Sequence, residues 1–254
     1  RTCWLAAGLP DHVPGTTIDR QCGSSQQAVH FAAQGVMSGT SDLIVAGGVQ
    51  QMSTIPISSS MLVGDQFGYP DPFSGSLGWQ ERYGDQEVSQ FRSAQMIADK
   101  WDCSRDEMES FAVESHERAI RARAEGRFDA EIAPFGEVMA DEGPREPNWD
   151  KIRSLRPLEE GGTITAAVAS QISDASAALL IASEQAVEDH GLTPRARIHH
   201  LSVRADDPVW MLTAPIPATR YALQKSGLTM DDIDLVEINE AFASVVLAWM
   251  KDLE

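Results

Sequence analysis

Cys22 is the residue of this chain whose surroundings best suit a chemical reaction. It lies in the run Thr17-Ile18-Asp19-Arg20-Gln21-Cys22-Gly23-Ser24-Ser25-Gln26-Gln27. Residues 16–18 have the pattern of a strand end, and residues 26–37, followed by Ser38-Gly39, have the pattern of a helix with a glycine stop. Unpaired N–H groups and the positive dipole at the start of a helix favour a thiolate. We therefore predict that Cys22 is a nucleophile and that the same N–H groups hold an oxyanion.

The residues that follow Cys22 bear on this prediction, because an isolated cysteine is more often a small buried packing residue. The run Cys22-Gly23-Ser24-Ser25-Gln26-Gln27-Ala28 is followed by Gly35-Val36-Met37-Ser38-Gly39 and by the glycine-rich, strand-like residues 42–48. Together they resemble the nucleophile segment of the thiolases, the acyl-CoA:CoA acyltransferases. The resemblance favours the nucleophile over the packing residue.

Two further segments resemble the same family. Residues 162–174 are similar to the thiolase segment that lines the pantetheine tunnel of coenzyme A, and here the resemblance implies that Ser170 offers its hydroxyl to the pantetheine amide. Residues 239–242 spell the NEAF motif, which in thiolases follows a strand and opens a helix. We expect residues 233–238 to form that strand and residues 241–250 that helix.

The NEAF motif implies roles for three of its residues. By the resemblance, Asn239 holds a water in a second oxyanion site, and Ala241 and Phe242 pack against the pantetheine arm and the substrate. Each residue also has a plain structural interpretation. Asn239 could cap the helix, Ala241 and Phe242 could pack within it, and Ser170 could be a solvated loop serine.

A cluster of cations precedes the tunnel segment, comprising Arg145, Lys151, Arg153 and Arg156. Thiolases often place an arginine near the adenine nucleotide, which implies a CoA-binding role for Arg145; a solvated loop and helix face is the alternative. Two positions depart from the family pattern. Val168 replaces a common asparagine, and Ala175 replaces a glycine, which puts the substrate fit in doubt.

Other parts of the thiolase machinery are absent from the sequence. The family uses a second cysteine as acid and base and a histidine that precedes proline, but Cys3 and Cys103 lack the glycine-rich surroundings of that cysteine and none of the six histidines precedes a proline. Family-like sequence runs from Arg1 to Glu254. We therefore expect an internal piece of a thiolase, truncated at both ends, with little turnover of its own.

Composition places further limits on function. The 254 residues are 43% hydrophobic and 23% charged, with a formal net charge of −18. This charge argues against a nucleic-acid partner, and no apolar run reaches the length of a membrane span, so we expect neither partner. Three scattered cysteines favour a reducing compartment, for which the cytoplasm is the default.

The resemblance implies an α/β fold, built from two similar βαβ halves in α/β/α layers with an inserted loop domain. We assign residues 1–51 with 162–193 to the N-terminal half, 52–161 to the loop domain, and 194–254 to the start of the C-terminal half. The loop domain should contain a helix over residues 87–101 and a second helix that begins after Ser104. Further along, a buried strand over 175–181 and helices over 184–190 and 220–226 are expected, with residues 198–203 opening the C-terminal half.

The implied reaction is thiolytic cleavage of a 3-ketoacyl-CoA, or the reverse Claisen condensation, through an acyl-cysteine at Cys22. Coenzyme A is a substrate, and no metal or permanently bound cofactor is expected. The family resemblance implies a homodimer or homotetramer for the full-length protein. The runs Asp19–Ala28 and Tyr83–Arg92 look most like actinobacterial thiolases of fatty-acid or steroid degradation. The alternatives are a non-catalytic CoA-binding or dimer-forming remnant and, ranked lower, a β-ketoacyl-carrier-protein synthase.

Overall fold

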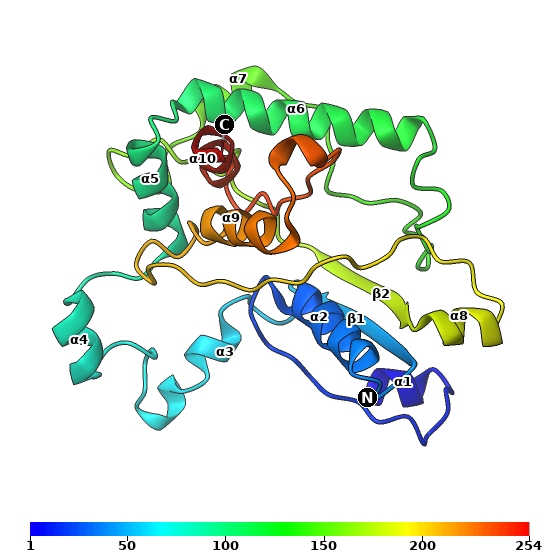
Figure 1. Cartoon of the computed structure of the whole chain (residues 1–254). Coiled ribbons are helices and arrows are strands. Elements are labelled where there is room, and N and C mark those ends of the chain that lie inside the picture. Colours follow the sequence, from blue (N-terminus) through cyan, green and yellow to red (C-terminus); the bar gives the residue numbers. More distant parts are fainter. Residues whose placement is uncertain (254) are drawn as a thin grey trace. The chain divides into compact units, whose positions relative to one another are not determined.

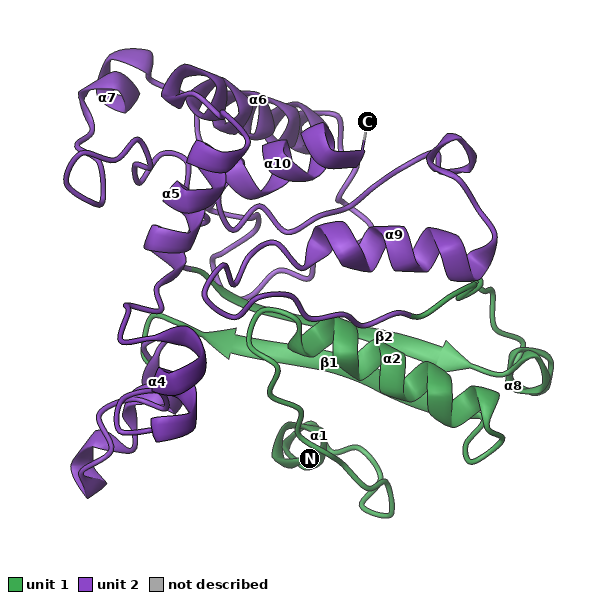
Figure 2. Cartoon of the chain, turned by 60° about the vertical axis from the view of Figure 1, so that its left-hand side comes forward, with its two compact units in different colours: residues 1–55, 173–201 green, residues 56–172, 202–254 purple. Residues whose placement is uncertain are grey.

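The computed structural model describes residues 1–253 of the chain. The backbone forms two compact units, coloured separately in Figure 2. The first contains residues 1–55 and 173–201, and the second contains residues 56–172 and the segment from Ser202 onward. The predicted three-part division of the chain stays a prediction.

The first unit is a two-stranded sheet with helices around it. Strand β1 (Leu43–Gln51) pairs antiparallel with β2 (Asp174–Ala182), so that Leu43 faces Ala182 and Gln51 faces Asp174. Helix α2 (Ser24–Met37) packs against both strands, as Figure 1 shows. The unit also contains the short helices α1 (Thr2–Ala6) and α8 (Glu184–Asp189).

Side chains close both ends of this strand pair. At one end, the Ser53 N–H and hydroxyl donate to the Asp174 carboxylate at 2.8 and 2.5 Å. These bonds lower the pKa of Asp174, because they stabilise the charged form of the carboxyl. At the other end, the Ser183 hydroxyl donates to the Asp42 carboxylate at 2.9 Å, and the Ser183 N–H donates to the Asp42 backbone carbonyl at 2.8 Å. The register of β1 on β2 is therefore held by polar contacts as well as by the ladder.

The prediction that residues 175–181 form a strand is confirmed, but the prediction that this strand is buried is wrong. Leu179 and Leu180 expose 55% and 50% of their surface. In the described residues the sheet contains only β1 and β2, so each strand has one unpaired edge and no further strand to shield it.

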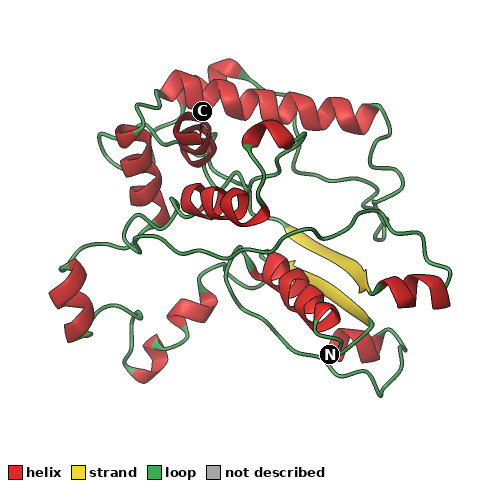
Figure 3. Ribbon diagram, viewed as in Figure 1, coloured by secondary structure: helices red, strands yellow, loops and turns green. Residues whose placement is uncertain are grey.

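The second unit is mainly helical (Figure 3). Its elements in chain order are α3 (Ser59–Leu62), the 3-10 turn η1 (Asp65–Phe67), α4 (Leu77–Tyr83), α5 (Gln90–Lys100), α6 (Arg105–Ala124), α7 (Trp149–Ser154), α9 (Pro215–Ser226), the 3-10 turn η2 (Met230–Asp232) and α10 (Ala243–Leu253).

Helix α10 is the centre of this unit, and it packs against α5, α6 and α9. All its residues from Ala243 to Trp249 are buried. The core around it contains Ala94 and Ile97 of α5 and Met108 of α6. Polar side chains within this core are paired, as in the bond from the fully buried Ser244 hydroxyl to the Ala94 carbonyl at 3.0 Å. Burial of an apolar helix on all sides explains why α10 forms despite its valines.

Several helix predictions are confirmed. Ser104 caps α6 by accepting a hydrogen bond from the Glu107 N–H at 3.2 Å, and the helix ends before Gly126, whose φ is +71°. The Glu107 carboxylate accepts a bond from Lys251 Nζ at 3.0 Å, so at this end of α6 Glu107 contributes its backbone N–H to the cap and its side chain to an ion pair. Helix α9 begins earlier than predicted, because Pro215 suits the first helical position.

Two predicted strand segments are wrong. Residues 16–18 and 233–238 are extended or irregular, and within residues 1–253 neither of them belongs to a sheet. A strand depends on hydrogen bonds to a neighbouring backbone, and the described residues place no such neighbour beside them. The α/β class is confirmed, with its strands in the first unit only.

Among residues 1–253, no helix combines the length and the apolar character that a membrane span requires.

Candidate active site

Cys22 lies in an exposed turn immediately before α2. Gly23 is the N-cap of this helix, and the first intrahelical bond runs from Gln27 N–H to the Gly23 carbonyl at 2.9 Å. The N–H groups of Ser25 and Gln26 therefore belong to the first turn, ahead of the helical ladder. The predicted position of the thiol at the start of a helix is confirmed, although an irregular segment precedes it instead of a strand.

The turn that carries Cys22 is tightly bonded. Gln21 has a φ of +46°, an unusual value for a residue other than glycine. The Ser24 hydroxyl donates to the Gln21 carbonyl at 2.7 Å and accepts from the Arg20 N–H at 2.8 Å. The Gln21 N–H in turn donates to Asp19 Oδ1 at 3.1 Å. The turn is thus held on both sides of Cys22, while the thiol itself is exposed.

Two contacts hold α2, the helix that follows this turn, in place. Gly48 of β1 approaches Ser25 so closely that a Cβ at residue 48 would lie 2.6 Å from the Ser25 hydroxyl oxygen. His30 is buried on α2, and burial, together with the charge of Arg20, lowers its pKa. Neutral His30 is therefore part of the packing that supports the helix.

The two other family-like segments pair with each other inside the second unit. The Ser170 N–H donates to the Ala241 carbonyl at 2.9 Å, and the Ala243 N–H donates to the Val168 carbonyl at 2.9 Å. Ala169 and Phe242 form the bridge between these bonds. Residues that are distant in the sequence thus form a short antiparallel pair, which brings together the predicted site residues Ser170, Ala241 and Phe242.

The side chains of this pair have different surroundings. Ser170 is exposed and Ala241 is half-buried, whereas Phe242 exposes 3% of its surface and packs edge-on against the Phe91 ring at 5.8 Å between centroids. Val168 also exposes 3% of its surface. The structure therefore places Phe242 and Val168 in the core and leaves the Ser170 hydroxyl accessible.

Asn239 is exposed and lies ahead of the paired segment. Helix α10 begins at Ala243, so its first turn starts too late for Asn239 to be its N-cap. The capping interpretation of Asn239 is therefore wrong. The neighbouring Glu240 is held in place, because its carboxylate accepts a bond from the Ser115 hydroxyl of α6 at 2.9 Å.

Arg145 lies at an exposed turn of the second unit, beside α6. Its backbone N–H donates to Nδ1 of His116 at 3.4 Å. Burial lowers the pKa of His116, the charge of Arg145 lowers it further, and Glu240 acts in the opposite direction. A single turn of α6 therefore contacts both the Arg145 turn and the residue after Asn239.

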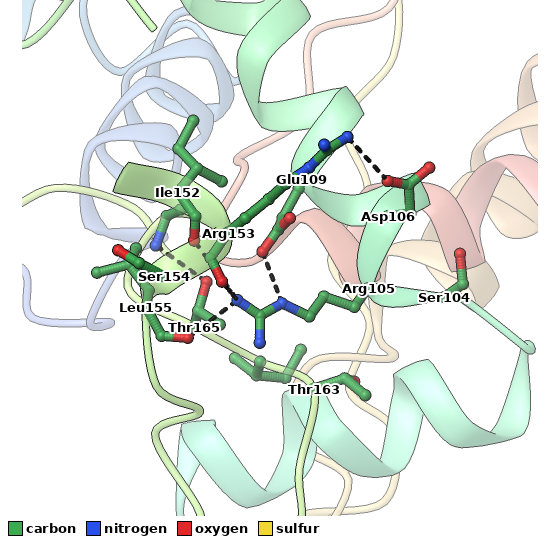
Figure 4. A network of polar contacts seen from close by, with 12 residues as sticks. Ser104, Arg105, Asp106, Glu109, Ile152, Arg153, Ser154, Leu155, Thr163 and Thr165 are labelled. Atoms are coloured by element: carbon green, nitrogen blue, oxygen red, sulfur yellow. Dashed lines mark hydrogen bonds and ion pairs between the residues drawn. The ribbon is translucent and has the colours of Figure 1, made fainter. Parts of the chain in front are cut away.

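Arg105 holds the basic segment in which Lys151 and Arg153 lie (Figure 4). Its Nε donates to the buried Glu109 carboxylate at 2.7 Å. One terminal nitrogen donates to the carbonyls of Ile152, Arg153 and Leu155 at 3.4, 3.2 and 2.9 Å. These carbonyls are at the end of α7, where an arginine is well placed to complete their bonding. Sequence reasoning missed Arg105, although its spacing from Glu109 predicts an ion pair on one helix face.

Gln95 of α5 was also missed. Its side-chain oxygen accepts from the N–H groups of Thr163 and Ile164 at 2.7 and 3.2 Å, at the start of the segment that contains Ser170. No local pattern marks Gln95, because its partners are far away in the sequence.

The predicted site residues are divided between the two units. Cys22 belongs to the first unit, and the second contains Arg145, Ser170, Asn239, Ala241 and Phe242.

Comparison with known proteins matches this arrangement to one family. Residues 1–185 match the model of the thiolase N-terminal domain, and residues 192–254 match that of the thiolase C-terminal domain. Steroid 3-ketoacyl-CoA thiolase FadA6 of Mycobacterium tuberculosis is 62% identical over 258 residues, which cover 100% of this chain and 63% of that protein. The 3-oxoadipyl-CoA/3-oxo-5,6-dehydrosuberyl-CoA thiolase of Escherichia coli is 36% identical over 271 residues, covering 100% of this chain and 67% of that protein.

A solved structure is similar as well. The crystal structure of the Bacillus anthracis acetyl-CoA acetyltransferase superimposes with a TM-score of 0.81 at 34% sequence identity, and the match covers 100% of this chain and 67% of that one. The chain spans 63% of the length of the M. tuberculosis relative.

Proposed function

The chain belongs to the thiolase family, and we propose from this that it carries the nucleophile and part of the coenzyme A site of an acyl-CoA:CoA C-acyltransferase. The observation that carries the proposal is the placement of Cys22. Its exposed thiol lies in a bonded turn immediately before α2, where first-turn N–H groups precede the helical ladder.

In the proposed reaction, the Cys22 thiolate attacks the 3-keto carbonyl carbon of a 3-ketoacyl-CoA. The bond between C2 and C3 breaks, its electron pair leaves with C2, and C2 takes up a proton to give acetyl-CoA. The shortened acyl group stays on sulfur as a thioester. The thiolate of a second CoA then attacks that thioester carbonyl, so the shortened acyl-CoA leaves and the Cys22 thiolate returns. The reverse sequence is the Claisen condensation.

The segments of the second unit supply the coenzyme A part of the proposal. The exposed Ser170 hydroxyl and the adjoining Ala241 contact the pantetheine arm, and Arg145 contacts the nucleotide end. Asn239, exposed and free of a capping role, holds the water of the second oxyanion site. Phe242 supports the paired segments, because its side chain is buried in the core and packs against Phe91.

We propose a 3-ketoacyl-CoA as the substrate. Within this class a steroid-derived compound is favoured, because the M. tuberculosis relative is named a steroid 3-ketoacyl-CoA thiolase. The protein is proposed to work in the cytoplasm as a homodimer or homotetramer. The three cysteines are all free thiols, in keeping with a reducing compartment.

Acyl transfer to Cys22 tests this function directly. The chain is incubated with acetoacetyl-CoA, digested, and analysed by mass spectrometry for a thioester on the peptide that contains residue 22. We expect an acetyl thioester on Cys22 that disappears when free CoA is added. Cys3 is the matched control, because it is also an exposed free thiol in the same unit.

The variants Cys22→Ser and Cys3→Ser complete the test. The first should abolish the adduct and the second should leave it unchanged. Equal labelling of Cys3 and Cys22, or no adduct at residue 22, would reject an acyl-enzyme. CoA binding without an adduct would instead support the non-catalytic remnant.

A further inference from the structure

We infer that Gln95 of α5 is a positioning residue for the pantetheine-binding segment, which it fixes by accepting hydrogen bonds from two consecutive backbone N–H groups. The inference rests on the proposed function, because it assigns a role to Gln95 within the coenzyme A site proposed above. Gln95 does not itself touch CoA in this role.

The contacts of Gln95 are unusually complete for one side chain. Its oxygen accepts from the N–H groups of Thr163 and Ile164 at 2.7 and 3.2 Å, and from the Thr163 hydroxyl at 3.4 Å. Its nitrogen donates to Asp99 Oδ1 at 2.8 Å and to the Thr163 hydroxyl at 3.2 Å. The bond to Asp99, one helical turn along α5, orients the amide so that its oxygen faces the segment.

Gly162 fits the same arrangement. A Cβ at residue 162 would lie 2.7 Å from the Gln95 side-chain oxygen, so glycine at residue 162 allows this close approach without a shift of the Gln95 side chain. The close approach and the two N–H bonds together make the Gln95 oxygen the acceptor around which residues 162–164 are folded.

Residues 164–169 connect the part of the segment that Gln95 holds to Ser170. Ile164, Thr165 and Val168 are buried, and the Val168 N–H donates to the Thr165 carbonyl at 3.1 Å, so the intervening residues form a packed turn. Val168 and Ser170 then pair with Ala243 and Ala241. The segment is therefore held at both ends, by Gln95 at its start and by the NEAF backbone after it.

Loss of the Gln95 acceptor should release the first of these two anchors. Two backbone N–H groups would be left without a partner in a half-buried place, which is costly enough to displace the segment. The Ser170 backbone would then be held by the pairing with Ala241 and Ala243, and the start of the segment would keep only the bond from the Leu158 N–H to the Ile164 carbonyl at 2.8 Å. Binding of the pantetheine arm should weaken, whereas binding of the nucleotide end at the Arg145 turn should not.

The test compares affinities for CoA and for adenosine 3′,5′-bisphosphate, a probe without the pantetheine arm. Both are measured by calorimetry on the chain and on Gln95→Met and Gln95→Glu. We expect Gln95→Met to weaken CoA binding about tenfold, in line with two lost acceptor contacts, and to leave binding of the bisphosphate unchanged. Gln95→Glu keeps an acceptor for the two N–H groups but replaces the donor to Asp99 with a second carboxylate, so it should retain part of the CoA affinity and bind CoA more tightly than Gln95→Met does.

Gln185 offers a matched control. It lies on α8 and donates to Asp189 Oδ1 at 2.8 Å, the same contact one turn along a helix that Gln95 makes with Asp99. Gln185→Met removes this bond without removing an acceptor for backbone N–H groups, and it should leave CoA affinity unchanged. Hydrogen exchange supplies a second measurement, in which the amides of Thr163 and Ile164 should exchange faster in Gln95→Met than in Gln95→Glu.

The outcomes separate cleanly. Equal CoA affinity of Gln95→Met and the unsubstituted chain, or an equal loss for CoA and the bisphosphate, overturns the positioning role. Failure of the unsubstituted chain to bind CoA overturns the proposed coenzyme A site, and exchange of the two amides then still decides whether Gln95 fixes the segment.

Discussion

The Ser170 N–H donates to the Ala241 carbonyl oxygen at 2.9 Å, which joins the two segments of the second unit for which we propose a coenzyme A-binding role. The bond places the exposed Ser170 hydroxyl next to the NEAF residues, although the two segments are far apart in the sequence. Because this pairing uses only backbone groups, it holds both segments in one geometry without a contribution from their side chains.

Removal of the Ser170 N–H is the direct test of this pair. Ser170→Pro eliminates the donor, and the preceding Ala169 is already extended in its bridge with Phe242, which suits a residue before proline. We expect a loss of about 1–3 kcal/mol in the free energy of unfolding, because the Ala241 carbonyl loses its partner. Urea denaturation measures this loss.

Ser170→Ala is the control for that substitution, since it keeps the N–H and removes only an exposed hydroxyl. Its free energy of unfolding should stay within about 0.5 kcal/mol of the original value. If the proline and alanine variants unfold at the same urea concentration, the backbone bond does not stabilise the unit.

Acid sensitivity should arise in part from His30. Burial, and then the charge of Arg20, lower its pKa in the folded chain, so the unfolded state binds a proton at higher pH than the folded state does. The contribution of neutral His30 to stability is present above its unfolded pKa of 6.5 and is lost as the pH falls below that value. His116 acts in the same direction, since its pKa is lowered too.

The measurement is the free energy of unfolding between about pH 7 and about pH 5, where histidines titrate. The His30→Gln variant should lose less stability over this range than the original chain. Gln34, which is exposed on the same helix and carries no titratable group, serves as the comparison, and Gln34→Ala should keep the original slope. A slope that His30→Gln leaves unchanged would show that His30 does not contribute to acid sensitivity.

The sequence predicted helices better than strands, because the signals that start and end a helix are local whereas a strand needs a partner from elsewhere in the chain. The signals for α6 are local, since Ser104 caps its start and Gly126 follows its end. The apolar residues of 233–238 also look like a strand, but a strand forms only where a second backbone accepts and donates its bonds. Leu235, in this segment, exposes 91% of its surface.

The candidate site was predictable only in part. Cys22, Ser170 and Asn239 lie in recognisable motifs, but helix patterning correctly placed only Cys22, ahead of α2. The segments before Cys22 and Asn239 are irregular where strands were predicted, and α10 begins only at Ala243. The burial of Phe242 and the contacts of Gln95 could not be anticipated, because both depend on partners from other elements of the second unit. A glycine such as Gly162 was the available clue, since a close backbone approach often requires one.

The neighbouring glycines of β1 should respond differently to the same substitution. A Cβ at Gly47 would lie 2.9 Å from the Ala177 carbonyl oxygen and 3.5 Å from the Ala178 Cα, so it would meet the backbone of the paired strand. A Cβ at Gly48 would lie 2.6 Å from the Ser25 hydroxyl oxygen, but that hydroxyl can rotate away, and the Ser25 Cβ is 3.9 Å distant. The backbone of β2 has no comparable freedom.

Gly47→Ala should therefore lower the free energy of unfolding by about 1–3 kcal/mol, as overpacking against a fixed neighbour does. Gly48→Ala should cost less, and addition of Ser25→Ala should recover most of that cost, because it removes the only side-chain atom that the new methyl group meets closely. Chemical denaturation of these three variants provides the measurement, and the rate of Cys22 alkylation reports on the turn before α2. A larger loss for Gly48→Ala than for Gly47→Ala would mean that the first turn of α2 yields less readily than the strand ladder does.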